Sequence, residues 1–213
     1  NRYGAQVLNT AWMLFLDTGI ALGGFLWLIL PQYQRLRQGV AEWAIARDWA
    51  WLFESGPSWL MSVHPQRGEV FWWLDFFMII AFMTGFMALV AAVLGSLTAA
   101  AAWLSGRMGG DATARQRFTE LGYQYAPVAM VSLIVGLGSG LFDPIALTPL
   151  GPTGAQAAKG LLFMLGAAWS VWLGARILAR QGVSAGRRWL PLLPGVLGSA
   201  LVGLAWWPAI FGL

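Results

Sequence analysis

Residues 71–104 read FWWLDFFMIIAFMTGFMALVAAVLGSLTAAAAWL, and this stretch decides the fold. Its 34 residues include one charged side chain, Asp75. About 20 apolar residues in a helix are enough to cross the hydrocarbon core of a bilayer. At about 1.5 Å per residue this helix would be roughly 50 Å long, so it should tilt or continue into water. The stretch predicts an integral membrane protein.

The composition of the whole chain agrees with this prediction. The 213 residues are 58% hydrophobic and 10% charged, with a mean hydropathy of +0.64. A soluble domain has about 25% charged residues, so a soluble globular protein is excluded. The net charge is +4, but the basic residues occur in short loops, where they set membrane orientation. Nucleic acid is therefore not an expected partner, whereas the lipid bilayer is.

The hydropathy pattern predicts an all-α, polytopic transmembrane bundle that forms one membrane domain over residues 1–213. A helical alternation of charged and apolar residues at about 36–54 predicts an amphipathic helix on the membrane surface. Five spans are expected, at residues 10–30, 71–104, 126–142, 157–178 and 189–211.

Arginines in the short loops predict the orientation of the bundle. Loops 105–118 and 177–188 carry three arginines each, whereas loop 147–154 and the C-terminal end carry none. Short loops rich in Lys and Arg stay in the cytoplasm. We therefore expect a multi-pass protein of a bacterial-type inner membrane, with a cytoplasmic N-terminus and the C-terminus outside. The chain does not open with a signal-peptide pattern, and a segment before Asn1 is expected.

Small residues recur one turn apart on several predicted spans. Such spacing lets neighbouring helices approach closely in a membrane. The candidate helix-packing residues are Gly19, Gly23, Gly166, Ser170, Gly174, Gly195, Ser199 and Gly203.

Two acidic residues fall inside predicted spans, Asp17 and Asp75. An acid at the bilayer centre costs about 2.5–3.5 kcal/mol, so such residues commonly serve a proton relay, an ion site or a pair with a partner group. The structural alternative is that water reaches Asp75 near an interface and that Asp17 is hydrogen-bonded between helices. The sequence leaves both alternatives open.

Metal and cofactor ligands are scarce in the sequence. The chain has no cysteine and one histidine, which excludes Cys-ligated zinc, Cys-ligated iron–sulfur clusters and a bis-histidine haem built by this chain alone. Met61 and His64 form a Met-x-x-His pair that could bind copper, but an interfacial loop histidine explains them better. No cofactor is expected within the chain itself.

Aromatic side chains are frequent near the predicted ends of the spans. They are typical of a membrane–water boundary, and the cluster at residues 72–77 would also suit contact with lipid, a flat quinone or a carotenoid. Candidates for interfacial or partner contacts are Trp43, Trp49, Trp51, Tyr123 and Tyr125. No catalytic triad, phosphate loop or paired-carboxylate site is present, and catalytic activity of the chain's own is not expected.

Residues 118–127, FTELGYQYAP, open a span that is followed by a Gly/Pro turn and by a second span ending in basic residues. Phe118, Leu121, Tyr123 and Pro127 follow the order F-x-x-L-x-Y-x-x-x-P. Residues 118–180 thereby resemble the C-terminal membrane part of polyferredoxin-type electron-transfer proteins, a group that includes the quinol dehydrogenase membrane component. The cysteine clusters of that group are absent, and serines at 132 and 139 stand in the region where its spans often carry histidines.

The resemblance implies a cluster-free membrane anchor or a scaffold on the quinone side. The expected function is a non-catalytic membrane subunit of a larger redox or energy-converting complex involved in electron transport. Its partners would be other membrane subunits that carry haem or iron–sulfur groups. The alternative is a small permease or channel that uses Asp17 and the glycine-rich third span. A membrane enzyme acting on lipid is the least favoured interpretation.

Overall fold

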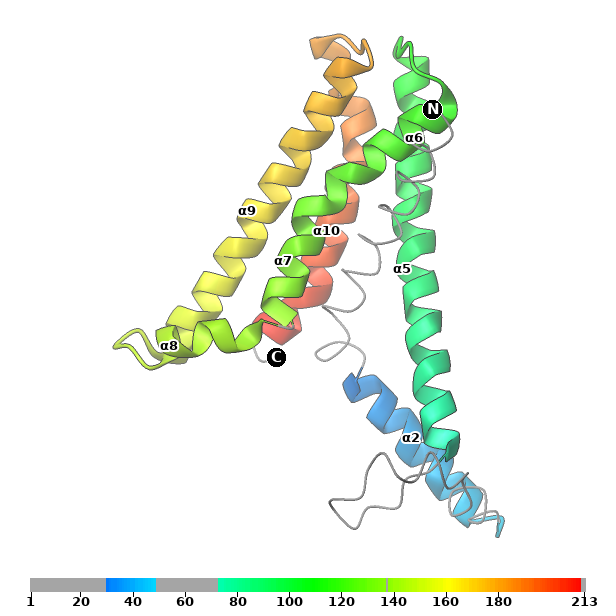
Figure 1. Cartoon of the computed structure of the whole chain (residues 1–213), viewed down its shortest axis with the longest axis vertical. Coiled ribbons are helices and arrows are strands. Elements are labelled where there is room, and N and C mark those ends of the chain that lie inside the picture. Colours follow the sequence, from blue (N-terminus) through cyan, green and yellow to red (C-terminus); the bar gives the residue numbers. More distant parts are fainter. Residues whose placement is uncertain (1–29, 49–72, 137, 212–213) are drawn as a thin grey trace, which may run out of the picture. The chain divides into compact units, whose positions relative to one another are not determined.

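The computed structural model describes residues 30–48, 73–136 and 138–211 (Figure 1). These residues are helical or lie in the turns between helices, and the described part contains no strand. The predicted all-α class is confirmed for it. Two compact units are present, Ile29–Phe86 and Met87–Leu213, and α5 (Trp73–Arg107) extends from one into the other.

The smaller unit contains α2 (Leu30–Ile45) and the beginning of α5. Tyr33 is 3% exposed, and its ring centroid lies 6.0 Å from that of Phe82 on α5. The helix α2 begins at Leu30, earlier than the surface helix expected at 36–54, and it ends at Ile45. Pro31 fits this position, because proline is tolerated in the first turn of a helix, where its missing N–H has no partner to lose.

The larger unit contains the remaining helices, which follow α5 in the sequence. They are α6 (Ala114–Gly122), η2 (Tyr123–Tyr125), α7 (Ala126–Gly136), η3 (Ser139–Phe142), α8 (Asp143–Ala146), α9 (Gly151–Arg180), η4 (Ala185–Arg187) and α10 (Trp189–Phe211).

Helical structure extends beyond the predicted third span, 126–142, at both ends and is interrupted within it. Helical structure begins at Ala114, inside the segment expected to be a polar loop, because Thr113 caps the helix by accepting a hydrogen bond of 3.3 Å from the Gln116 amide. The chain passes from α6 through η2 into α7, and α7 ends at Gly136. The axis then turns by 77° between this segment and Ser139–Ala146.

Three described helices are long and apolar enough to cross a membrane. They are Phe77–Arg107, Gly151–Arg180 and Trp189–Pro208. A fourth candidate is obtained if the bent segment 114–146 counts as one span. The predicted first span, 10–30, lies outside the described residues. Helices that could span a membrane thus coincide with three of the predicted spans, or with four if the bent segment is counted, while the total of five remains a prediction.

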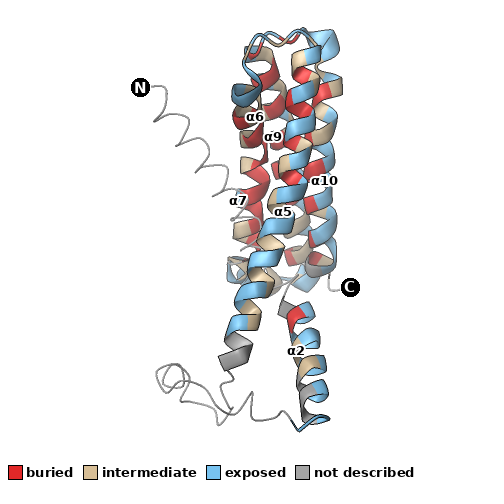
Figure 2. Ribbon diagram, turned by 90° about the vertical axis from the view of Figure 1, so that its right-hand side faces the viewer, coloured by how far each residue is buried: buried red, intermediate tan, exposed pale blue. Residues whose placement is uncertain are grey.

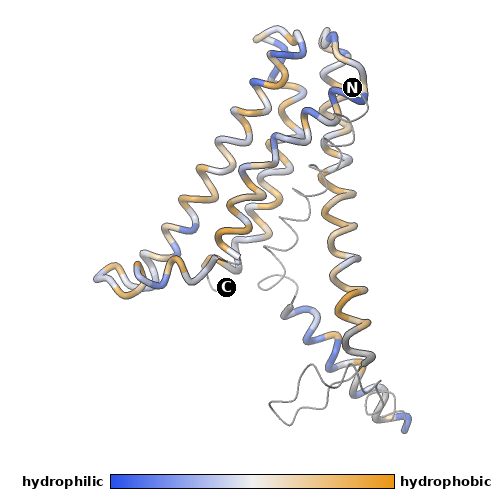
Figure 3. Tube along the Cα trace, in the orientation of Figure 1, coloured by the Kyte–Doolittle hydropathy of each residue, from blue (hydrophilic) through white to orange (hydrophobic). Residues whose placement is uncertain are grey.

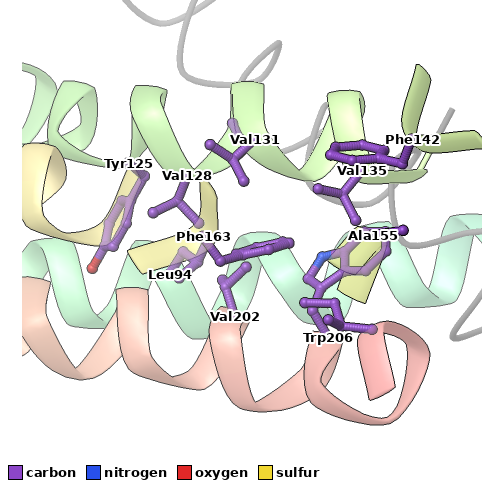
Figure 4. Close-up of a cluster of buried hydrophobic side chains, with 12 residues drawn as sticks. Leu94, Tyr125, Val128, Val131, Val135, Phe142, Ala155, Phe163, Val202 and Trp206 are labelled. Carbon is purple, nitrogen blue, oxygen red and sulfur yellow. The ribbon is translucent and has the colours of Figure 1, made fainter. Parts of the chain in front are cut away.

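The core of the larger unit lies between α7, α9 and α10. Figure 2 shows buried residues along the facing sides of these helices, and Figure 4 shows Phe163, Val202 and Trp206 directed toward one another. The rings of Phe163 and Trp206 have centroids 5.5 Å apart. α7 packs along α9, and its residues are almost all buried or half-buried.

Candidate functional site

Gln124 is the central side chain of the helix packing. It is 1% exposed, and it occupies the space that two glycines leave free. A Cβ on Gly174 of α9 would lie 2.7 Å from Gln124 Oε1, and a Cβ on Gly195 of α10 would lie 2.7 Å from Gln124 Cδ. Real Cβ atoms are not found so close to such atoms, so both positions require glycine while Gln124 keeps this place.

Two further glycines make similar close approaches. A Cβ on Gly198 would lie 2.7 Å from Tyr125 Cε1, and a Cβ on Gly166 would lie 2.8 Å from Val131 Cγ2. Tyr125 is 2% exposed and donates a long hydrogen bond, 3.4 Å, to the Pro194 carbonyl. By contrast, a Cβ on Gly203 would meet no atom within 4 Å. Three of the six predicted small-residue positions on α9 and α10, Gly166, Gly174 and Gly195, thus face α7 or η2.

Several polar atoms in this packing have no hydrogen-bond partner among the described residues. They are Gln124 Nε2, Ser132 Oγ, Ser170 Oγ, Ser199 Oγ and Trp206 Nε1. Each belongs to a side chain that is at most 3% exposed. The packing is nevertheless close around Gln124, so these atoms mark the inside of the bundle rather than a space for a ligand.

A second polar group of residues lies where α5, α6 and α9 meet, and we call it the polar junction: Ser105, Gln116, Glu120 and Gln181. Ser105 Oγ donates to Gln181 Oε1 at 2.9 Å, and Gln181 Nε2 donates to Glu120 Oε2 at 3.0 Å. Gln116 Nε2 donates to the other carboxylate oxygen, Glu120 Oε1, at 2.7 Å. The junction therefore holds one carboxylate with an amide donor on each oxygen.

The loop after α5 is fixed by backbone contacts beside the junction. The amide of Asp111 donates to the Gln181 carbonyl at 3.0 Å. Gly182 has φ = +83°, and a Cβ there would lie 2.8 Å from Asp111 Oδ2. Because a left-handed backbone and a close neighbour coincide, glycine is required at 182.

Arg117 connects α6 to the end of α5. Its Nε donates to the Ala102 carbonyl at 3.0 Å, and its Nη1 donates to the carbonyls of Gly110 and Ala112. A basic side chain near the C-terminal end of a helix is favourable. Arg117 thereby holds the 108–113 turn against α5.

A cavity of about 730 Å³ opens beside the junction. The polar part of this cavity lies near the start of α6 and the end of α9, where Figure 3 shows hydrophilic residues. Its apolar wall consists of Ala126, Leu173 and Ile177, and the rest of the lining is Asp111, Ala112, Gln116, Glu120, Tyr123, Arg180 and Gln181. This volume is in the range of small-molecule sites, about 300–1,000 Å³.

α5 has a row of small side chains on a side that the described residues leave exposed. We call Ala88, Ala92, Ser96 and Ala99 the α5 small-residue face. At 100° per residue, their directions fall within about 80° of one another. The buried residues of α5, such as Leu94, Thr98 and Ser105, point to a different side. In the most apolar 18-residue part of α5, 6% of the residues are buried, against 33% in the corresponding parts of α9 and α10.

Many of the candidates named from the sequence lie outside the described residues, namely Asp17, Gly19, Gly23, Trp49, Trp51, Met61 and His64. Asp75 is the third residue of α5. Trp43 is 46% exposed on α2, with the Arg47 guanidinium 4.4 Å from its ring centroid. Tyr123 lies half-buried at the cavity, whereas Tyr125 is inside the bundle. Within the described ranges, no three His, Cys, Asp or Glu residues gather as they would around a metal ion.

Sequence reasoning did not single out the polar junction or the cavity. Glutamines 116 and 181 carry no charge, and the hydrogen bonds of Gln181 reach residues 61 and 76 positions away. The one local signal was the amphipathic segment ARQRFTELG, which α6 forms.

Comparisons with protein-family models, with curated proteins and with solved structures found no match for this chain.

Proposed function

We propose that this chain is a non-catalytic membrane subunit, with five spans in all, that packs against other membrane subunits of a redox or energy-converting complex. One observation carries the proposal. The α5 small-residue face is exposed in the described part of the chain, on a helix that is long and apolar enough to cross a membrane.

Lipid and protein place different demands on such a face. Leu, Ile, Val and Phe suit contact with lipid tails, and small residues offer lipid no advantage. Between helices, small residues allow close backbone approach and van der Waals contact, which drive association in a membrane. The face covers about 16 Å of helix at about 1.5 Å per residue, which is three turns and enough for a helix–helix crossing.

The bundle itself supplies an internal reference for this reasoning. Gly166, Gly174 and Gly195 are small residues that face helices of the same chain, and each has a large side chain within van der Waals distance. Gly95, beside the α5 face, has no atom within 4 Å of its Cβ position. These three glycines on α9 and α10 thus have neighbours within the chain, whereas Gly95 on α5 has no such neighbour among the described residues. The redox nature of the partner is supported by the sequence resemblance alone.

The absence of cysteine makes the face directly testable. Ser96→Cys adds one thiol to it with almost no change in volume, and Leu204→Cys on α10, where Leu204 is 66% exposed, is the matched control. In native membranes, a short bifunctional thiol–amine reagent should link position 96, but not 204, to another polypeptide. Haem- or cluster-bearing proteins should also co-purify in mild detergent.

The proposal fails if position 96 gives no more adduct than position 204. It also fails if the purified chain alone moves a solute across liposomes. An adduct between two copies of this chain would contradict the hetero-subunit form of the proposal.

A permease or channel is the second candidate, and the break between α7 and η3 favours it. Transporters often place broken helices at their substrate sites. A Cβ on Gly138 would lie 2.6 Å from the Ile134 carbonyl, so the break depends on a glycine. Replacing Asp17 by Asn tests this function, since a solute path through Asp17 should lose transport while assembly is retained.

A further inference from the structure

The cavity at the polar junction changes in polarity along its length. Leu173 and Ile177 of α9 and Gln181, which directly follows this helix, line the cavity at intervals of four residues, on one side over about 12 Å. This wall is therefore apolar at Leu173 and polar at Gln181, whose amide donates a hydrogen bond to Glu120.

The opposite wall also has a polar and an apolar end, but here the residues become less polar as the residue number increases. Gln116, Glu120, Tyr123 and Ala126 line the cavity at intervals of four and three residues. Hydrogen bonding between Glu120 and Gln181 joins the polar ends of the two walls. Ala126 and Leu173 therefore both lie toward the apolar end. A ligand that fills this cavity must have a polar head and an apolar tail.

The charges of the cavity identify the head more closely. Glu120 and Asp111 contribute carboxylates and Arg180 contributes a guanidinium. Among the described residues none of these three forms an ion pair. The Glu120 carboxylate is held in position by Gln116 and Gln181, and it keeps lone pairs for another donor.

From this arrangement we infer that the cavity binds a zwitterionic phospholipid with a primary ammonium, of the phosphatidylethanolamine type. The ammonium meets the carboxylates of Glu120 and Asp111, the phosphate meets Arg180, and an acyl chain lies along Ile177 and Leu173. An uncharged quinol head would form no ion pair with these three groups, whereas this head pairs with charges of both signs. Trimethylation of the ammonium removes its N–H donors, so choline lipids bind less well.

The test uses the full chain, delipidated in a neutral maltoside detergent. Phosphatidylethanolamine, phosphatidylcholine and phosphatidylglycerol with the same acyl chains are titrated, and both the thermal midpoint and retention in native mass spectrometry are measured. The ethanolamine lipid should raise the midpoint most. Free phosphoethanolamine, which has the head without the chains, should bind much more weakly because it leaves the apolar wall uncovered.

Glu120→Gln keeps the shape of the side chain and removes its charge. It should weaken binding of the ethanolamine lipid about tenfold and abolish its preference over choline, because a charge-assisted hydrogen bond becomes a neutral one. Asp143→Asn, an exposed acid away from the cavity, is the matched control and should change neither. If Glu120→Gln folds poorly, Arg180→Gln at an exposed position tests the phosphate contact in the same way.

Equal stabilisation by all three lipids would overturn the inference, since it indicates a non-specific lipid belt. A preference for phosphatidylglycerol, or selective stabilisation by a quinol, would overturn it as well. So would a full ethanolamine preference retained by both variants.

Discussion

α9 and α5 are both long apolar helices rich in small residues, and the structure uses these residues differently. On α9, Gly166 and Gly174 each lie against a large side chain of the preceding segment. On α5, Gly85 and Gly95 have no atom within 4 Å of their Cβ positions, and Ala92 is exposed. A small residue in a membrane helix is thus a fixed part of the fold only where a neighbour fills the space beside it.

The largest expected effect is at the most crowded glycine. Gly195→Val should destabilise the bundle by about 3 kcal/mol, because overpacking in a close-packed core costs about 1–3 kcal/mol and the Gln124 side chain must also move. Reversible unfolding in mixed micelles measures the change. Gly203→Val, on the same helix, is the control and should change the free energy of unfolding little, since its Cβ meets open space.

A double substitution sharpens this prediction. If Gln124 is the obstacle, Gly195→Ala combined with Gln124→Ala should cost less than the sum of the two single changes, by about 1 kcal/mol. Additive costs would show that the conflict lies elsewhere.

Arg117→Ala should have the next largest effect, about 2 kcal/mol, because it removes hydrogen bonds from a charged group to three backbone carbonyls. Arg115→Ala, an exposed neighbour on α6, is the control. The thermal unfolding midpoints of the two variants are measured in the same detergent, and that of Arg117→Ala should be the lower. Equal midpoints would contradict the role given to Arg117.

Gly182→Ala should cost about 1 kcal/mol, since alanine is unfavourable at positive φ and its Cβ would approach Asp111. Gly186→Ala, where a Cβ meets nothing within 4 Å, should be neutral or slightly stabilising. Limited proteolysis of the 108–113 turn gives a second measurement, because loosening Asp111 should speed cleavage there.

The smallest effect on stability is expected on the α5 small-residue face. Ala92→Leu should change the unfolding free energy of the isolated chain by less than about 0.5 kcal/mol, as surface substitutions usually do. The same change should nevertheless reduce co-purification of partner subunits. A large loss of stability in the isolated chain would show that this face is covered within the chain.

Hydropathy alone was sufficient to locate α5, α9 and α10, because an apolar run of that length has few other uses. The ladders of small residues on α9 and α10 were also visible, since their spacing is local. The start of α6 was missed because its polar residues suggested a loop, although Thr113 is a good helix cap. The polar junction was missed because its bonds join residues far apart in sequence, and spacing does not report such contacts.

The position of Gln124 also sets an order of assembly during synthesis. Its two glycine neighbours belong to α9 and α10, and α10 is the last of the described helices to leave the ribosome. Until Trp189–Phe211 has inserted, the amide lacks one of the two surfaces that enclose it. A nascent chain stopped after Arg188 would leave this amide uncovered on the side that α10 occupies, so the packing around Gln124 is complete only once the last described helix is in place.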